Sequence, residues 1–273
     1  MRSVMNKLLH RLSEYSHIAV NLLFPPVCPA CGKVSGSFID GELCGSCRDI
    51  FFEQFVTKCH TCGKTPYDCR CIPDLFGNDS DRSPFTVIHP LTFSGYYTGY
   101  DADSVVSSLV FNLKGDHSCG AGIFFARMIV QSISKNLIMW EIPREDIVVT
   151  YIPRSKAAYD EHFFDHMEIV SAQVARMLGC RTAKLLSRSG GTAQKKLSQS
   201  EREINASETI DINSKESKKI MGAKILLIDD IITTGSTMKT AVSRLSLAGA
   251  EMIIPCCAML SNIKKKNKEQ TPI

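Results

Sequence analysis

Two adjacent carboxylates followed by a loop of hydroxyl-bearing residues form the most informative chemical pattern in this chain. The carboxylates are Asp229 and Asp230, and they follow the apolar run 225–228. The loop consists of Thr233, Thr234, Gly235, Ser236 and Thr237. Hydroxyl groups can donate to a phosphate, whereas carboxylates accept hydrogen bonds from sugar hydroxyls or bind a hydrated cation. These residue types therefore predict a site for a sugar phosphate.

The elements expected around these residues favour the same interpretation. The run 225–228 is expected to be a buried strand that ends at the carboxylates, and helical spacing follows over 236–248. Backbone N–H groups and the helix dipole favour an anion at such a helix N-terminus, and Gly235 lets the backbone approach it closely. The alternative is an ordinary strand end with a helix cap. A cap, however, needs one hydroxyl residue and not four around a glycine.

Eight of the twelve cysteines lie between residues 28 and 71, in closely spaced pairs that are typical of metal sites. Cys-x-x-Cys pairs fit a tetrahedral zinc site, although the last pair of the second cluster is one residue shorter. The candidate ligands are Cys28, Cys31, Cys44, Cys47, Cys59, Cys62, Cys69 and Cys71. We expect one or two structural Zn²⁺ sites, with either sequential pairing or an interleaved cross-brace.

Two roles remain open for this cysteine-rich segment. A segment so short cannot bury enough apolar surface by itself, so the metal could simply hold it together. Alternatively, basic residues such as Lys33 and Arg48 could contact nucleic acid or protein, although no aromatic stacking pattern accompanies them. Cysteine pairs of the metal-binding type favour a cytoplasmic protein, and no transmembrane segment is expected because no apolar run is long enough.

Composition divides the chain into five parts. We expect an amphipathic helix at 1–26, a zinc ribbon module at 27–72, a polar linker at 73–85, an α/β domain at 86–262 and a basic disordered tail at 263–273. Within the domain, periodicity predicts strands at 86–94, 147–152, 182–186, 225–228 and 252–259, and helices at 105–113, 119–138, 162–178 and 236–248. This alternation predicts a parallel sheet with helices on both faces, which binds ligands beyond the carboxyl ends of its strands.

The run 225–238 resembles, position for position, the 5-phosphoribosyl-1-pyrophosphate (PRPP) signature of type I phosphoribosyltransferases. That resemblance implies that Asp229 and Asp230 hold the ribose 2′ and 3′ hydroxyls and that the loop after them holds the 5′-phosphate. Three further features precede the signature: the segment 23–26, the cysteine pairs and the stretch 113–116. Their order resembles the ComF family, amidophosphoribosyltransferase-like proteins linked to DNA uptake in natural competence.

The same resemblance implies cations for a departing pyrophosphate. Lys195 and Lys196 occupy the place of the flexible active-site loop and could close over the pyrophosphate, although a solvated basic loop is the alternative. The loop that contains Arg154, Ser155 and Lys156 could hold the pyrophosphate from beneath, with Mg²⁺ bridging the remaining charge.

The chain departs from the ComF pattern after the pyrophosphate loop. The segment 163–166 lacks the Gly and the Gln that such chains usually carry there. His162 and His166 lie one helical turn apart, which could suggest a metal pair or a base. Without a third ligand nearby, we interpret them as surface or core histidines.

The site chemistry and the resemblance to ComF proteins leave three functions open, and a role in DNA uptake is implied by the resemblance alone. The protein could bind PRPP or ribose 5-phosphate without turnover and handle single-stranded DNA during uptake, beside competence helicase machinery. It could be a phosphoribosyltransferase for an unidentified base or amine, or a PRPP-sensing regulator. The formal charge of +4 is too small to identify a polyanionic partner.

Overall fold

The structure of the chain is a computed structural model that describes residues 25–35, 39–54, 63–65, 82–97, 104–115, 119–156, 159–160, 163–189 and 209–261. Residues 1–24 of the expected N-terminal helix, the second cysteine cluster, Lys195, Lys196 and the basic tail lie outside these ranges. None of the helices within them has the length and hydropathy of a membrane span.

The central sheet has six strands, and all of its pairings are parallel. Its order is β1 (Val87–Ile88), β8 (Met252–Ser261), β7 (Lys224–Ile232), β3 (Ile147–Tyr151) and β4 (Arg181–Thr182), with β2 (Thr92–Tyr97) also paired to β8. A separate antiparallel pair joins β5 (Leu186–Arg188) to β6 (Ile210–Ile212). The sheet is buried from both sides, which explains why β7 and β8 are almost continuously apolar.

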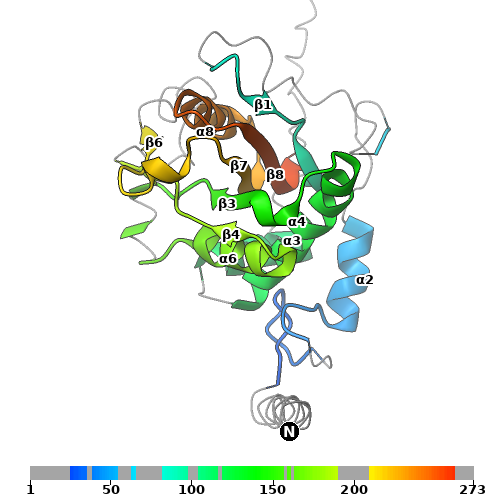
Figure 1. Cartoon of the computed structure of the whole chain (residues 1–273). Helices are drawn as coiled ribbons and strands as arrows, with labels where there is room; N and C mark the ends of the chain where they lie inside the picture. The colour runs from blue at the N-terminus through cyan, green and yellow to red at the C-terminus, as the bar shows by residue number, and fades with distance from the viewer. Residues whose placement is uncertain are drawn as a thin grey trace, which may run out of the picture.

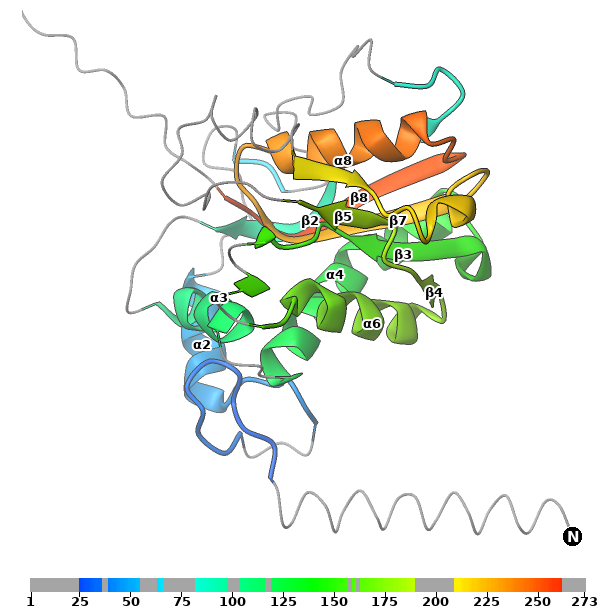
Figure 2. The ribbon, with the colours of Figure 1, turned by 90° about the vertical axis from the view of Figure 1, so that its left-hand side faces the viewer.

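Helices cover both faces of this sheet (Figure 1, Figure 2). One face carries α8 (Ser236–Leu247), and the other carries α3 (Val105–Gly115), α4 (Cys119–Met139) and α6 (His166–Leu178). Each face has its own cluster of buried apolar side chains, with Phe125 and Leu109 in one and Met238 and Val242 in the other. The predicted α/β fold with helices on both faces is therefore confirmed.

One strand boundary differs in a way that matters for the site. We expected the strand to end at the carboxylates, but β7 continues through Asp229 and Asp230 to Ile232. The reason is its neighbour β8, which stays paired with β7 as far as Ile232. In contrast, β3 leaves β7 after Ile228. The carboxylates therefore lie within a strand, at the point where one of its two neighbours has ended.

Other boundaries shift because of local chemistry. The expected strand 86–94 is broken into β1 and β2 around Pro90, which has no N–H to donate to the sheet. The expected strand 182–186 is divided between β4 and β5, which belong to different sheets. The expected helix 162–178 begins only at His166, because Asp165 caps α6 by accepting a hydrogen bond from the backbone N–H of Met167.

The described part of the cysteine-rich segment, which includes α2 (Gly45–Gln54), packs directly on this domain. Cys28, Cys47 and Phe51 belong to the same buried cluster as the residues of α3 and α4. The ring of Phe51 meets that of Phe124 edge to face, with 5.3 Å between their centroids. This part of the cysteine-rich segment therefore shares a hydrophobic core with the α/β domain.

Candidate functional site

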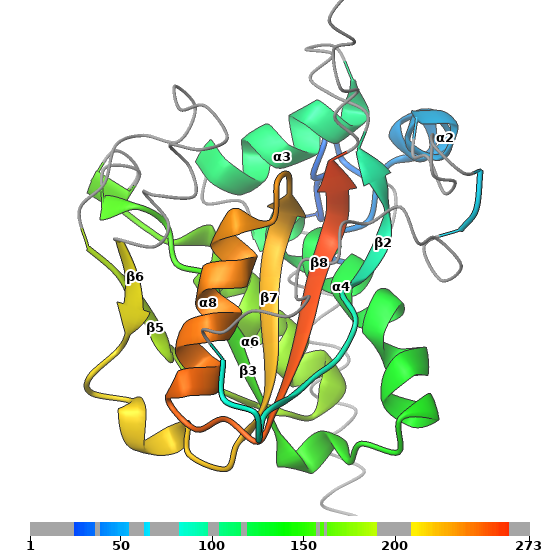
Figure 3. The same ribbon diagram turned by 90° about the horizontal axis from the view of Figure 1, so that it is seen from above.

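The acid pair lies at the carboxyl ends of the strands, beside the end of α3. Figure 3 shows α3 across the ends toward which β7 and β8 point. The pair follows the last pairing of β7 with β3, between Ile228 and Tyr151. Open α/β sheets bind ligands at this edge, so the signature residues occupy the expected place.

Asp230 is a buried carboxylate with three hydrogen-bond donors around it. Its Oδ2 lies 2.8 Å from the Nζ of Lys114 and 3.2 Å from the Nε2 of His166, while its Oδ1 accepts from the backbone N–H of Ile231 at 2.7 Å. Burial by itself would raise the pKa of Asp230, but the charges and hydrogen bonds of Lys114 and His166 outweigh it and hold the pKa well below its usual range. Asp230 is therefore ionised.

Asp229 differs from its neighbour in exposure and in charge state. Its side chain is partly exposed, and its Oδ1 accepts a hydrogen bond of 2.9 Å from the backbone N–H of Asp230. Burial and the negative charge of Asp230 raise the pKa of Asp229 well above its usual range. The pair therefore combines one firmly ionised carboxylate with one that holds a proton more readily.

Arg188 in β5 adds a cation near Asp229. Burial lowers the pKa of its guanidinium, while the charge of Asp229 acts in the opposite direction. Its Nε donates to the Oγ1 of Thr209 at 3.2 Å, and its Nη2 is buried with no hydrogen-bond partner among the described residues. Sequence reasoning missed this arginine, because nothing in the local pattern of 186–189 distinguishes it.

The hydroxyl loop lies between the end of β7 and the start of α8, as expected. Gly235 is the N-cap residue and has a φ of 80°, a left-handed conformation that glycine adopts without steric cost. Because glycine has no side chain, α8 begins without a side-chain cap to bind its first backbone N–H groups. The hydroxyls of Thr234 and Ser236 lie 2.7 Å apart. The loop thus has the backbone and hydroxyl donors of an anion site.

The loop after β3 lies next to the acid pair, because Ile152 donates its backbone N–H to the oxygen of Ile228 at 3.1 Å. Within this loop, Ser155 is buried and Lys156 is exposed. The guanidinium of Arg154 donates to the backbone oxygens of Phe164 and Lys114, and it lies 5.3 Å from the centroid of the Phe164 ring. Arg154 therefore ties this loop to α3 and to the start of α6. Its contact with a pyrophosphate stays a prediction.

Two of the residues around Asp230 were not recognised as site residues in the sequence. The stretch containing Lys114 contributed to the family resemblance, but it suggested no role for the lysine. The sequence predicts His166 to be a surface or core histidine; the structure shows it buried and hydrogen-bonded to Asp230. Its neighbour His162 lies outside the described residues.

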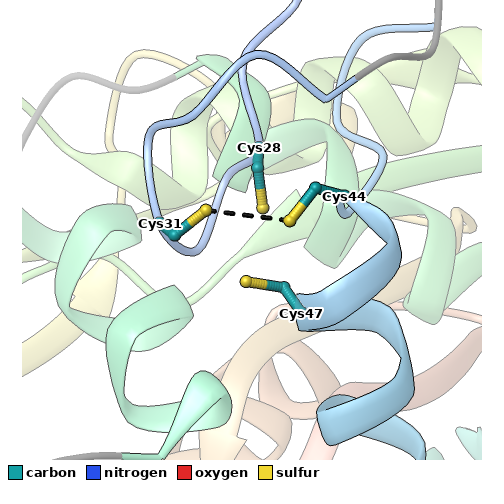
Figure 4. A group of neighbouring side chains, drawn as sticks. All are labelled: Cys28, Cys31, Cys44 and Cys47. Atoms are coloured by element: carbon teal, nitrogen blue, oxygen red, sulfur yellow. Dashed lines mark hydrogen bonds between the residues drawn. The ribbon is translucent and has the colours of Figure 1, made fainter.

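The first four cysteines converge on one point (Figure 4). All four sulfurs lie within 4.8 Å of one another, and the Sγ atoms of Cys31 and Cys44 are 3.8 Å apart. Four sulfurs at about 2.3 Å from a tetrahedral zinc would be separated by about 3.8 Å. Burial raises the pKa of Cys28, but backbone N–H donors outweigh it and lower the pKa to about 7, whereas burial raises the pKa of Cys31 and of Cys47. Cys28, Cys31, Cys44 and Cys47 could therefore form a zinc site.

Comparison with known proteins identifies the fold around this site. The family model of the phosphoribosyl transferase domain matches residues 169–273. Together with the parallel sheet and its helices, this match shows a phosphoribosyltransferase-like fold. A comparison with curated protein sequences found no match.

Similar solved structures include the allosteric regulatory enzyme of purine biosynthesis, with 18% identity and a TM-score of 0.31 over 50% of this chain. The chain spans only 24% of that enzyme's length. Adenine phosphoribosyltransferase from Leishmania tarentolae is also similar, with 15% identity and a TM-score of 0.29, over 61% of this chain and 80% of that one.

Proposed function

We propose that this protein binds PRPP or ribose 5-phosphate, together with Mg²⁺, at the edge formed by β7 and α8. The observation that carries the proposal is the geometry of one continuous segment. An acid pair at the carboxyl end of a parallel strand is followed by a loop of hydroxyls and by an uncapped helix N-terminus. The match of residues 169–273 to the phosphoribosyl transferase domain supports the same ligand class.

Each part of the ligand has a proposed partner. Asp229 and Asp230 accept hydrogen bonds from the ribose hydroxyls, and the loop 233–237 together with the first N–H groups of α8 binds the 5′-phosphate. The pyrophosphate at C1 lies toward the loop 154–156. Mg²⁺ is typically held by phosphate oxygens and one or two carboxylates, so the partly exposed Asp229 is a suitable protein ligand for it.

A transferase reaction would break the bond between C1 and the pyrophosphate and form a bond from C1 to a nitrogen nucleophile. Positive charge at the pyrophosphate favours this step, which is the role proposed for Lys195 and Lys196. In an enzyme, replacing both lysines with alanine should slow turnover. In a PRPP-sensing regulator, the same replacement should weaken ligand affinity alone.

Phosphorus NMR of PRPP with Mg²⁺ and the full chain tests both binding and turnover. Binding should shift or broaden the 5′-phosphate resonance. Transfer to an added base such as adenine or hypoxanthine should produce free pyrophosphate. An unchanged spectrum at millimolar protein would contradict the proposal, and binding without pyrophosphate release from any base tested would favour the regulator.

A role in DNA uptake in the cytoplasm is the second candidate, and its support is the four-cysteine cluster beside the α/β domain together with the resemblance to ComF proteins. In this function the cysteine-rich segment contacts single-stranded DNA. Binding should weaken steeply with salt and weaken further when Cys28 and Cys31 are replaced with serine. An affinity for single-stranded DNA that is unchanged in this variant would show that the cysteine-rich segment does not contact the DNA.

A further inference from the structure

Asp230 is held by two side chains that come from elements outside the signature. Lys114 lies in the last turn of α3, and His166 is the first residue of α6. Both reach the same oxygen, Oδ2, at 2.8 Å and 3.2 Å. The three side chains thus form a Lys114–Asp230–His166 cluster.

The backbone fixes both partners at this place. The oxygen of Lys114 accepts a hydrogen bond from the guanidinium of Arg154, which holds the end of α3 against the loop after β3. Asp165 caps α6 and so sets where its first residue, His166, lies. Packed helix ends therefore place the half-exposed side chain of Lys114 and the buried ring of His166 beside Asp230.

His166 has Asp230 as its hydrogen-bond partner within the described structure. The Nδ1 of the ring is buried and makes no hydrogen bond to any described residue, and it lies 3.9 Å from the Oδ1 of Asp165. A carboxylate can only accept, so Nε2 must carry the proton that faces Oδ2. The ring therefore donates its one hydrogen bond to a described residue at the acid pair.

The described donors to Asp230 do not account for all of its acceptor positions. A carboxylate has about four lone-pair positions, and the backbone N–H of Ile231, Lys114 and His166 together occupy three of them. We propose that Lys114 and His166 are positioning residues of the ribose site, which hold the Asp230 carboxylate so that its remaining acceptor position meets a sugar hydroxyl. This inference rests on the proposed function.

Electrostatics supports this arrangement. A carboxylate buried in this way would otherwise favour its neutral form, which is a weaker acceptor. The ammonium group of Lys114, 2.8 Å from Oδ2, places a positive charge directly beside this carboxylate. Charge-assisted hydrogen bonds of this kind are also shorter and stronger than neutral ones.

The test compares two probes, ribose 5-phosphate and inorganic phosphate, whose affinities are measured by phosphorus NMR titration of the full chain. His166→Ala and Lys114→Met should each weaken ribose 5-phosphate binding by about tenfold, the effect of losing one hydrogen bond to a charged group. The affinity for inorganic phosphate should change by less than about twofold, because binding by the hydroxyl loop 233–237 does not depend on the cluster. His166→Gln retains an N–H of similar reach and should recover most of the lost affinity.

A matched control separates this effect from a general loss of stability. Lys224→Met removes an ion pair of 3.0 Å with Asp146 at the other end of β7 and should change neither affinity. Lys114 is the safer test of the two, because its side chain is 40% exposed and its loss should leave the fold intact.

Each other outcome contradicts the inference in its own way. Equal losses for both probes would show a general structural effect, and unchanged affinities would show that the cluster has no part in binding. If His166→Gln does not recover affinity for ribose 5-phosphate, the lost hydrogen bond is not the cause of the weaker binding in His166→Ala. If the wild-type protein binds inorganic phosphate but not ribose 5-phosphate, the proposed function itself is wrong and this inference is wrong with it.

Discussion

The side-chain amide of Asn112 donates to the backbone oxygen of Pro29 at 2.8 Å, and so joins α3 to the loop that carries the first two cysteines. The same amide reaches the oxygen of Ala30 at 3.1 Å. Two residues further along α3, Lys114 binds Asp230. One helix therefore contacts both the four-cysteine cluster and the acid pair, and the two sites are structurally linked.

Removal of zinc should consequently affect both sites. We expect a strong chelator to lower the melting temperature by several degrees, because a zinc ion bound by these cysteines would hold the two cysteine pairs together. It should also weaken ribose 5-phosphate binding, since the position of α3 depends on that loop. Scanning calorimetry and titration before and after chelation measure the two effects.

Cys47→Ser should reproduce the effects of chelation and remove one zinc ion per chain, as measured by elemental analysis. Cys119→Ser is the matched control, because Cys119 is exposed and lies outside the four-cysteine cluster. Wild-type protein that contains no zinc after purification in metal-replete medium would contradict this account of the cysteines.

The two carboxylates should respond oppositely to neutralisation near neutral pH. Asp230→Asn leaves Lys114 and His166 without their charged partner. It should cost about 2 kcal/mol, less than a fully buried pair because Lys114 is partly exposed, and lower the melting temperature by about 4–8 °C. Asp229→Asn should raise the melting temperature, because burial and the charge of Asp230 oppose ionisation of Asp229. Scanning calorimetry of the single variants measures both changes in melting temperature. Changes of the same sign would contradict the assignment of different charge states to the two carboxylates.

The contributions of Asp229 and Asp230 to stability should also depend on pH in opposite ways. The pKa of Asp230 is lower in the folded protein than its ordinary value. Its contribution to stability is therefore present above about pH 4 and is lost as the pH falls further. For Asp229 the folded pKa is raised, so its unfavourable effect at neutral pH fades as the pH falls toward about 4. Melting curves of Asp230→Asn and wild type should converge in acid, and parallel curves would exclude the ion cluster as a source of stability.

Gly235→Ala should damage the phosphate loop specifically. Alanine at a φ of 80° costs about 1–2 kcal/mol, and in the proposed site a Cβ here would hinder the close approach of the backbone to a phosphate. Gly179→Ala is the matched control, because Gly179 has a φ of 73° at the end of α6 with open space around it. Both variants should lose similar stability, but only Gly235→Ala should lose affinity for ribose 5-phosphate. Equal affinities by calorimetric titration would place the phosphate elsewhere.

The sequence alone predicts the helices and strands that are marked by patterns within their own residues. The helices at 105–113, 119–138 and 236–248 and the strand 252–259 agree with the structure within one or two residues, because periodicity and glycine positions mark them. The extension of β7 past Asp229 could not be predicted. It depends on how far β8 runs beside it, which is a property of two strands and not of one.

The side chains that surround the acid pair could not be predicted from the sequence either. His166 and Asp230 are 64 positions apart, and only the packing of α6 against the sheet brings them together. Arg188 lies close enough to Asp229 for the two charges to interact, because β5 pairs with β6, a pairing that the sequence does not predict. The signature itself was predictable because its residues are consecutive and its chemistry is local.

Calorimetric titration of the full chain with PRPP and Mg²⁺, beside the Asp229→Asn variant, tests the central claim most directly. The variant keeps the Lys114–Asp230–His166 cluster and should remain folded. We expect saturable binding by the wild-type protein and at least about a tenfold loss of affinity in the variant. Absence of binding by the wild-type protein, or equal affinities of the two proteins, would contradict the assignment of this edge as a PRPP site.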